Sequence, residues 1–124
     1  MATVHPILVV KKRLPPAELA KFIGRPFPDM VKFVVDLDRR ILAVGGQLHA
    51  DAEEILLERG SRQASLWGGN YHPGVGEAEC IEYESMINIR PARGNLGMEV
   101  QDPGIREKMR AIVFDLVGRG EPLP

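Results

Sequence analysis

The chain has 124 residues, which is enough for one domain with a sizeable core and short for two. Its 16 Lys and Arg residues almost balance its 17 Asp and Glu residues. The resulting formal net charge of −1 argues against a nucleic-acid binder, a class that is typically strongly basic. Hydrophobic residues make up 44% of the chain and charged residues 27%, the balance of a folded globular protein rather than a disordered one.

No targeting or membrane signal is visible in the sequence. The apolar stretch Ile7–Val10 is followed rather than preceded by basic residues, the reverse of a secretory signal. It is also far shorter than the ~20 residues that a membrane span needs. The only cysteine, Cys80, has no partner for an internal disulfide. We therefore expect a cytoplasmic protein without membrane contact.

The small net charge hides a segregation along the chain. Residues 1–40 carry eight basic and four acidic side chains, residues 41–85 carry two and eight, and residues 86–124 carry six and five. One interpretation is that distant segments neutralise one another across the fold. The other is a bipolar surface that favours self-association or an oriented partner.

The first half of the chain is predicted to alternate strands and helices. Val4–Lys11 is rich in β-branched residues and predicts a strand, whereas Ala17–Ile23 follows two prolines and predicts a short helix. Val31–Leu37 and Ile41–Val44 are apolar runs separated by a short polar turn, which predicts a hairpin. Ala52–Arg59 predicts a second helix.

The second half begins with a short predicted strand, Ser65–Asn70. Glu79–Arg90 shows the clearest strand pattern of the chain, because apolar and polar residues alternate with a period of two. Asp102 is the predicted N-cap of a last helix that starts at Pro103 and ends at Gly118 or Gly120, with an apolar stripe at helical spacing. A tail follows from about residue 119.

These elements follow one another in the order β-α-β-β-α-β-β-α. Hairpins combined with separate helices indicate an α+β fold. We expect a two-layer sandwich, with a mainly antiparallel sheet and the helices packed on one face, and a single domain over residues 1–124.

Several well-known catalytic and cofactor motifs are missing. The sequence contains no phosphate-binding P-loop, no dinucleotide-binding glycine fingerprint, no Cys-x-x-Cys pair and no G-x-S-x-G elbow. These absences argue against the corresponding enzyme classes and against a structural zinc site. The cofactor, if there is one, stays unknown.

A first candidate site contains His49 and Asp51. An imidazole and a carboxylate two residues apart at a chain bend could act as a general acid–base pair or as weak candidate ligands of a divalent metal. The metal would need a further ligand, for which the sequence offers His72, Glu82 and Glu84. The alternative is structural, with Asp51 as the N-cap of the second helix in a capping box with Glu54, and His49 packed beside it.

A second candidate site is formed by Asn88, Arg90, Arg93 and Asn95. Two guanidinium groups and two amides at the end of the predicted strand could cradle a carboxylate or a phosphate. The alternative is that Arg90 pairs with an acid of residues 77–84 across the sheet.

Trp67 is the only tryptophan and precedes two glycines and Asn70. It could form the flat wall of a pocket beside these groups, with Asn70 as a further ligand-binding residue. A lone tryptophan is more often a large core residue.

The combination of the segments LHADAE, LWGGN and SMINIRPARGN resembles a family of small prokaryotic proteins catalogued as a domain of unknown function, over about Met30–Val113. The resemblance implies relatives without an assigned activity and supplies no catalytic residues. It does imply that the selected residues belong to the characteristic motifs of the family: His49, Asp51, Trp67, Asn70, Asn88, Arg90 and Asn95.

Three functions are compatible with these observations. The leading hypothesis is a binding module for an anionic small molecule or an acidic partner segment, which would use Asn88, Arg90, Arg93 and Asn95 beside Trp67 and Asn70. The second is a hydrolase that uses His49 with Asp51, directly or through a metal. The third is a structural or interaction protein, a small homodimer, suggested by the sorted charges and an edge-like first strand.

Overall fold

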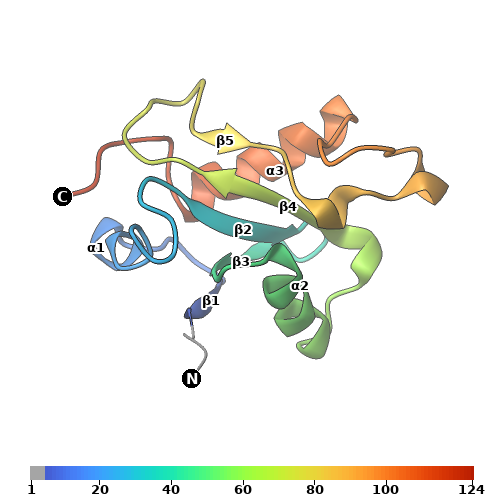
Figure 1. Ribbon diagram of the computed structural model, residues 1–124, viewed down its shortest axis with the longest axis horizontal. Coiled ribbons are helices and arrows are strands. Elements are labelled where there is room, and N and C mark those ends of the chain that lie inside the picture. The colour runs from blue at the N-terminus through green and yellow to red at the C-terminus, as the bar shows by residue number, and fades with distance from the viewer. Residues whose placement is uncertain (1–4) are drawn as a thin grey trace.

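The computed structural model describes residues 5–124, so Val4, the expected start of the first strand, lies outside the described residues. Five strands form one antiparallel sheet in the order β1-β3-β2-β4-β5 (Figure 1). Their bounds are Ile7–Val10 for β1, Val31–Asp36 for β2, Ile41–Gly45 for β3, Leu66–Tyr71 for β4 and Ile81–Glu82 for β5.

Within residues 5–124 the sheet is accompanied by three α-helices: α1 (Pro16–Ala20), α2 (His49–Glu58) and α3 (Pro103–Leu116). Three short 3₁₀ turns, η1 (Gln63–Ser65), η2 (Met86–Asn88) and η3 (Pro91–Arg93), lie in the connections. The predicted order of strands and helices and the α+β class with an antiparallel sheet are thus confirmed. Among the described residues, no helix is both long and apolar enough to cross a membrane.

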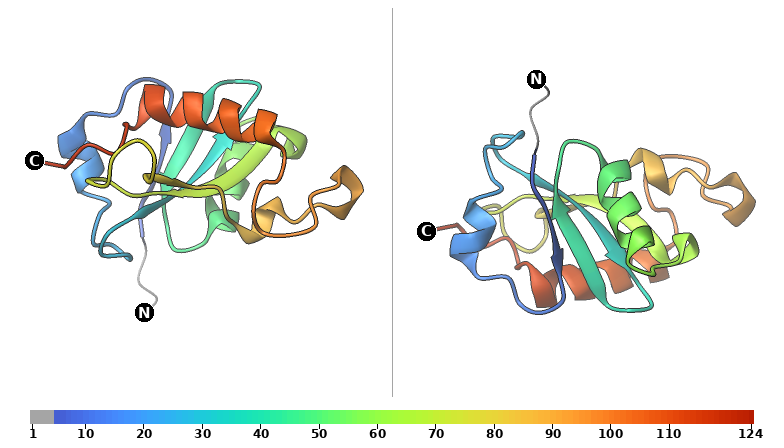
Figure 2. Two further views of the ribbon diagram at one scale, coloured as in Figure 1. Left: turned by 90° about the horizontal axis from the view of Figure 1, so that it is seen from above. Right: turned by 90° about the horizontal axis from the view of Figure 1, so that it is seen from below.

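The helices divide between the two faces of the sheet, which corrects the expectation that they lie on one face. Helix α3 covers one face and α2 the other (Figure 2). Phe33 and Val35 pack in a core cluster with α3, whereas Val34 packs in a second cluster with α2. The reason is that β2 and β3 carry apolar residues at successive positions, so both of their faces must be covered.

Helix α2 begins three residues earlier than predicted. Leu48 is its N-cap and makes no side-chain capping bond, so the predicted capping box with Asp51 as N-cap is wrong. Asp51 lies in the first turn instead, where a carboxylate is stabilised by the helix dipole. His49 becomes the first helical residue, and its buried ring is anchored by a hydrogen bond to β4.

The predicted strand Glu79–Arg90 is mostly not a strand. Only Ile81–Glu82 pairs with β4, and the chain then turns into η2. The physical reason is local, because the Ser85 hydroxyl accepts a hydrogen bond from the Ile87 N–H and thereby closes a turn. The alternating pattern therefore predicted the wrong backbone conformation after Glu82.

The last helix behaves as predicted. Asp102 caps α3, because its carboxylate accepts hydrogen bonds from the N–H groups of Gly104 and Ile105. The apolar stripe of α3 is buried against the sheet: Met109, Ile112, Val113 and Leu116. Helix α3 thus contributes a wall to a hollow on its face of the sheet, and α2 contributes a wall to a second hollow on the opposite face.

Candidate functional site

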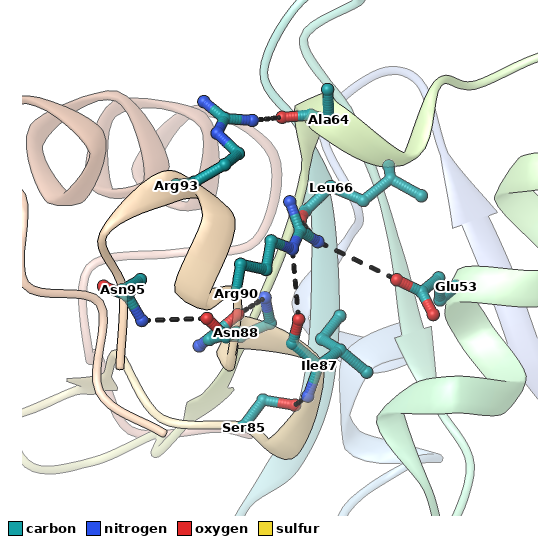
Figure 3. Close-up of polar contacts among 10 residues, drawn as sticks. Glu53, Ala64, Leu66, Ser85, Ile87, Asn88, Arg90, Arg93 and Asn95 are labelled. Carbon is teal, nitrogen blue, oxygen red and sulfur yellow. Dashed lines mark hydrogen bonds and ion pairs between the residues drawn. The ribbon is translucent and has the colours of Figure 1, made fainter. Parts of the chain in front are cut away.

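The two predicted amides, Asn88 and Asn95, hold the segment after β5 against the sheet (Figure 3). Asn88 Oδ1 accepts from the Gly68 N–H at 2.9 Å, and Asn88 Nδ2 donates to the Gly68 carbonyl at 2.9 Å. The side chain thus pairs with β4 as a neighbouring strand would. Asn95 Nδ2 donates to the Asn88 carbonyl at 2.8 Å, and Asn95 Oδ1 accepts from the Gln101 N–H at 2.9 Å. Both amides are buried and used internally.

Arg90 crosses the edge of β4 and is largely enclosed. Its guanidinium donates to the carbonyls of Leu66 and Ile87 and lies 4.5 Å from the centroid of the Trp67 ring. Its acidic partner is Glu53 on α2, with 3.8 Å between Arg90 Nη2 and Glu53 Oε2. The side chains of Arg90 and Glu53 are only 12% and 14% exposed. The predicted partner, an acid of residues 77–84, is therefore replaced by one from a helix.

Burial governs the charge of this pair. It lowers the pKa of Arg90 and raises the pKa of Glu53, while each charge partly offsets the effect on the other. Arg90 connects α2 to the ring of Trp67 and holds the segment after η2 in place. Its guanidinium is not the open cradle that the sequence suggested.

Arg93 lies on the outer side of the same ring and lines a hollow of about 330 Å³, called here the cationic hollow. Its walls come from the β2–β3 turn, η1, β4, η3 and α3: Leu37, Asp38, Arg40, Ala64, Ser65, Trp67, Arg93, Ile105 and Lys108. Arg40, Arg93 and Lys108 are exposed basic residues, and Arg93 is held by a hydrogen bond to the Ala64 carbonyl at 2.5 Å.

Asp38 is the one acidic residue that lines the cationic hollow, and other groups already engage it. It accepts from the Ser65 hydroxyl at 2.6 Å and from Arg62 at 2.7 Å. These two hydrogen bonds, with a smaller contribution from the positive charge of Lys108, lower the pKa of Asp38. The carboxylate stays ionised, and three basic residues against one acid leave the lining positive.

Trp67 forms part of the wall of the cationic hollow and is 1% exposed, so the core interpretation of this residue is confirmed. Its indole N–H has no hydrogen-bond partner within residues 5–124. A buried donor without an acceptor is unfavourable, and native proteins contain few of them. Arg93 also lies over this ring, 5.5 Å from its centroid.

His49 lines a different hollow, across the sheet from Trp67, of about 500 Å³. This His49 hollow also contains Asn70, so Asn70 does not accompany Trp67 and Arg93 as the sequence suggested. His49 Nε2 lies 2.7 Å from the Gly69 carbonyl, which can only accept, so Nε2 carries the proton. Burial is the main cause that lowers the pKa of His49 to about 4, and the ring is neutral at pH 7.

Asp51 does not join His49. Its exposed side chain lines a third hollow with His5, Gly46 and Ile55, on the other side of the first turn of α2. His72 Nε2 is hydrogen-bonded to Glu82 Oε1 at 2.6 Å. Within the described part of the chain, no group of three or more His, Cys, Asp or Glu residues is arranged to hold a metal ion.

The comparisons agree with the resemblance seen in the sequence. The fold and the sites define a small α+β protein with a five-stranded antiparallel sheet and hollows on both of its faces. Residues 8–116 match the model of the family described as "Protein of unknown function (DUF5674)", and the chain belongs to this family. Comparison with curated proteins gave no match, and comparison with solved structures gave none either.

Two residues of the cationic hollow, Arg40 and Lys108, were missed in the sequence. They are 68 positions apart and carry no local motif. Arg40 is the last residue of the β2–β3 turn, directly before β3, and has a φ of 54°. Only the packing of α3 on the sheet brings Lys108 to the same hollow, so no signal along the chain could have found this pair.

Proposed function

We propose that the protein is a binding module for a small anionic ligand, one that carries a phosphate or carboxylate group, and that the ligand occupies the cationic hollow. The observation that carries the proposal is the convergence of Arg40, Arg93 and Lys108 on one hollow of about 330 Å³. Guanidinium groups suit the planar or tetrahedral oxygens of such ligands, and a lysine adds a mobile positive charge.

The unpartnered indole of Trp67 supports the same proposal. An oxygen of the ligand that reached the indole N–H would supply the acceptor that it lacks. This version keeps Arg93 and Trp67 from the sequence hypothesis, assigns Asn88, Asn95 and Arg90 to the scaffold, and adds Arg40 and Lys108.

Titration with inorganic phosphate and citrate at constant ionic strength tests the proposal, with isothermal calorimetry as the readout. We expect saturable binding by wild type, and about fivefold weaker binding after either Arg93→Gln or Lys108→Gln. Lys12→Gln removes the same charge from an exposed residue outside the hollow and is the matched control. Absence of binding by wild type, or an equal effect of all three substitutions, would overturn the proposal.

The two other hypotheses have less support. A hydrolase that uses His49 with Asp51 would need the two side chains to meet, and they line separate hollows. The homodimer stays a prediction: β1 is an edge strand paired with β3 alone, and Leu8 on it is 40% exposed. Sedimentation at several protein concentrations would measure it directly.

A further inference from the structure

The His49 hollow, at about 500 Å³, is larger than the cationic hollow, and the proposed anion site does not use it. It lies between the start of α2, the centre of the sheet and the segment around η2. Ligand pockets for small molecules fall in the same range of volume, and combine an apolar lining with a few placed polar groups.

Among the polar groups that line this hollow, Asn70 Oδ1 and the Glu84 carboxylate are acceptors, whereas Lys32 and the Ser85 hydroxyl carry donors. Asn70 Oδ1 is buried and has no partner among the described residues, while Asn70 Nδ2 lies 3.3 Å from Glu82 Oε1 and donates to it. The neutral ring of His49 has one N–H, which donates to the Gly69 carbonyl. The ring therefore has no second N–H that could donate to a ligand. A buried acceptor without a donor is the kind of defect that a bound ligand can repair.

The charges around the hollow are compatible with a cation. Glu84 is an exposed residue that lines it, and Glu82 lies next to Asn70. The one basic residue of the lining is Lys32, whose ammonium lies 5.0 Å from the centroid of the Phe27 ring. Glu84 is thus the one carboxylate of the lining and Lys32 its one ammonium group, which already has an aromatic partner, whereas Glu82 lies outside the lining and contacts His72.

The rim of the hollow is apolar and exposed to solvent. Leu48 is 59% exposed and Met86 is 73% exposed, and Ile87 and Met98 continue the same lining. Methionine side chains adapt their shape to different apolar groups. A ligand with a hydrocarbon body would remove this surface from water.

We propose that the His49 hollow binds a small organic ammonium ion, with its N–H groups on Asn70 Oδ1 and the Glu84 carboxylate and its hydrocarbon body against Leu48, Met86 and Met98. The ligand supplies the donor that Asn70 Oδ1 lacks and a positive charge beside Glu84. The site is independent of the proposed anion site, which lies on the opposite face of the sheet.

The test uses n-hexylammonium as the probe and the ring resonances of His49 as the readout, because a bound ligand lies against this ring. Two comparison molecules separate the contributions. Hexan-1-ol keeps the chain without the charge, and hexyltrimethylammonium keeps the chain and charge without any N–H. We expect a saturable shift of the His49 resonances with hexylammonium, and about tenfold weaker binding of each comparison molecule.

Substitutions of residues in the His49 hollow test where the ligand binds. Asn70→Leu removes the unpartnered oxygen, and we expect about tenfold weaker binding; Glu84→Gln removes an exposed charge, and we expect about threefold weaker binding. Glu84→Gln keeps the proposal testable if Asn70→Leu does not fold. Asp51→Asn, on the same helix turn but outside the hollow, is the control and keeps wild-type affinity. Equal binding of all three molecules, unchanged affinity of Glu84→Gln, or no binding by wild type would overturn the proposal.

Discussion

Acidification is expected to destabilise the protein through His49. The folded state holds this ring neutral, since burial lowers the pKa from 6.5 to about 4, whereas the unfolded chain protonates it near 6.5. Between these two values the unfolded state binds more protons, so the stability that is fully present above pH 6.5 falls as the pH drops. The difference of about 2.5 pKa units corresponds to a loss of about 3 kcal/mol by pH 4.

Such a loss is a large part of the 5–15 kcal/mol that typically stabilises a domain. Carboxylates also take up protons on acidification, so wild type must be compared with a variant that lacks only the imidazole. His49→Gln places an amide N–H near the position of Nε2 and can keep the hydrogen bond to the Gly69 carbonyl. The measurement is the free energy of unfolding in urea for both proteins between pH 7 and pH 4.

We expect wild type to lose about 3 kcal/mol more than His49→Gln over this range. An independent check is the titration of the His49 ring in proton NMR, which should stay unchanged down to about pH 5. A ring that titrates near pH 6.5, or parallel loss of stability by the two proteins, would refute the reasoning.

Three further predictions concern the scaffold. Asn88→Ala removes three side-chain hydrogen bonds from a buried position, so we expect a loss of about 3 kcal/mol in chemical unfolding; a loss below 1 kcal/mol would contradict the role of this amide. Gly69→Ala would bring a Cβ to 2.5 Å from Phe33 Cζ, so we expect the free energy of unfolding to fall by more than about 2 kcal/mol. The control is Gly97→Ala, whose Cβ would lie 3.9 Å from its nearest neighbour, and we expect its free energy of unfolding to change by at most about 0.5 kcal/mol. Burial raises the pKa of the Cys80 thiol, so iodoacetamide at pH 7 should label it only after unfolding; rapid labelling of the folded protein would contradict its burial.

The parts of the fold that the sequence predicts well are those fixed by local chemistry. Asp102 followed by a proline and an apolar stripe is enough to define α3, because capping and helical periodicity act within a few residues. The β2–β3 hairpin follows in the same way from two apolar runs and a short polar turn. The resemblance in the motifs is likewise confirmed at the level of the family.

The candidate sites were harder to predict because each depends on how separate elements pack. His49 and Asp51 are close in the sequence, but residues i and i+2 of a helix do not face each other, and once α2 starts at His49 the pair is divided. Asn88 looked like a ligand-binding amide, yet it substitutes for a strand partner of Gly68, which no pattern of residue types reveals. Conversely, Lys108 reaches the cationic hollow only through the docking of α3.

The central claim, that an anion binds in the cationic hollow, is tested most directly at the indole of Trp67. The chain has one tryptophan, so its indole N–H gives a single side-chain signal in a nitrogen-15 correlation spectrum. We predict that phosphate shifts this signal saturably in wild type and in Lys12→Gln, and only weakly in the doubly substituted Arg93→Gln/Lys108→Gln protein. An indole signal that stays in place in wild type, up to phosphate concentrations in the tens of millimolar at constant ionic strength, would contradict the account.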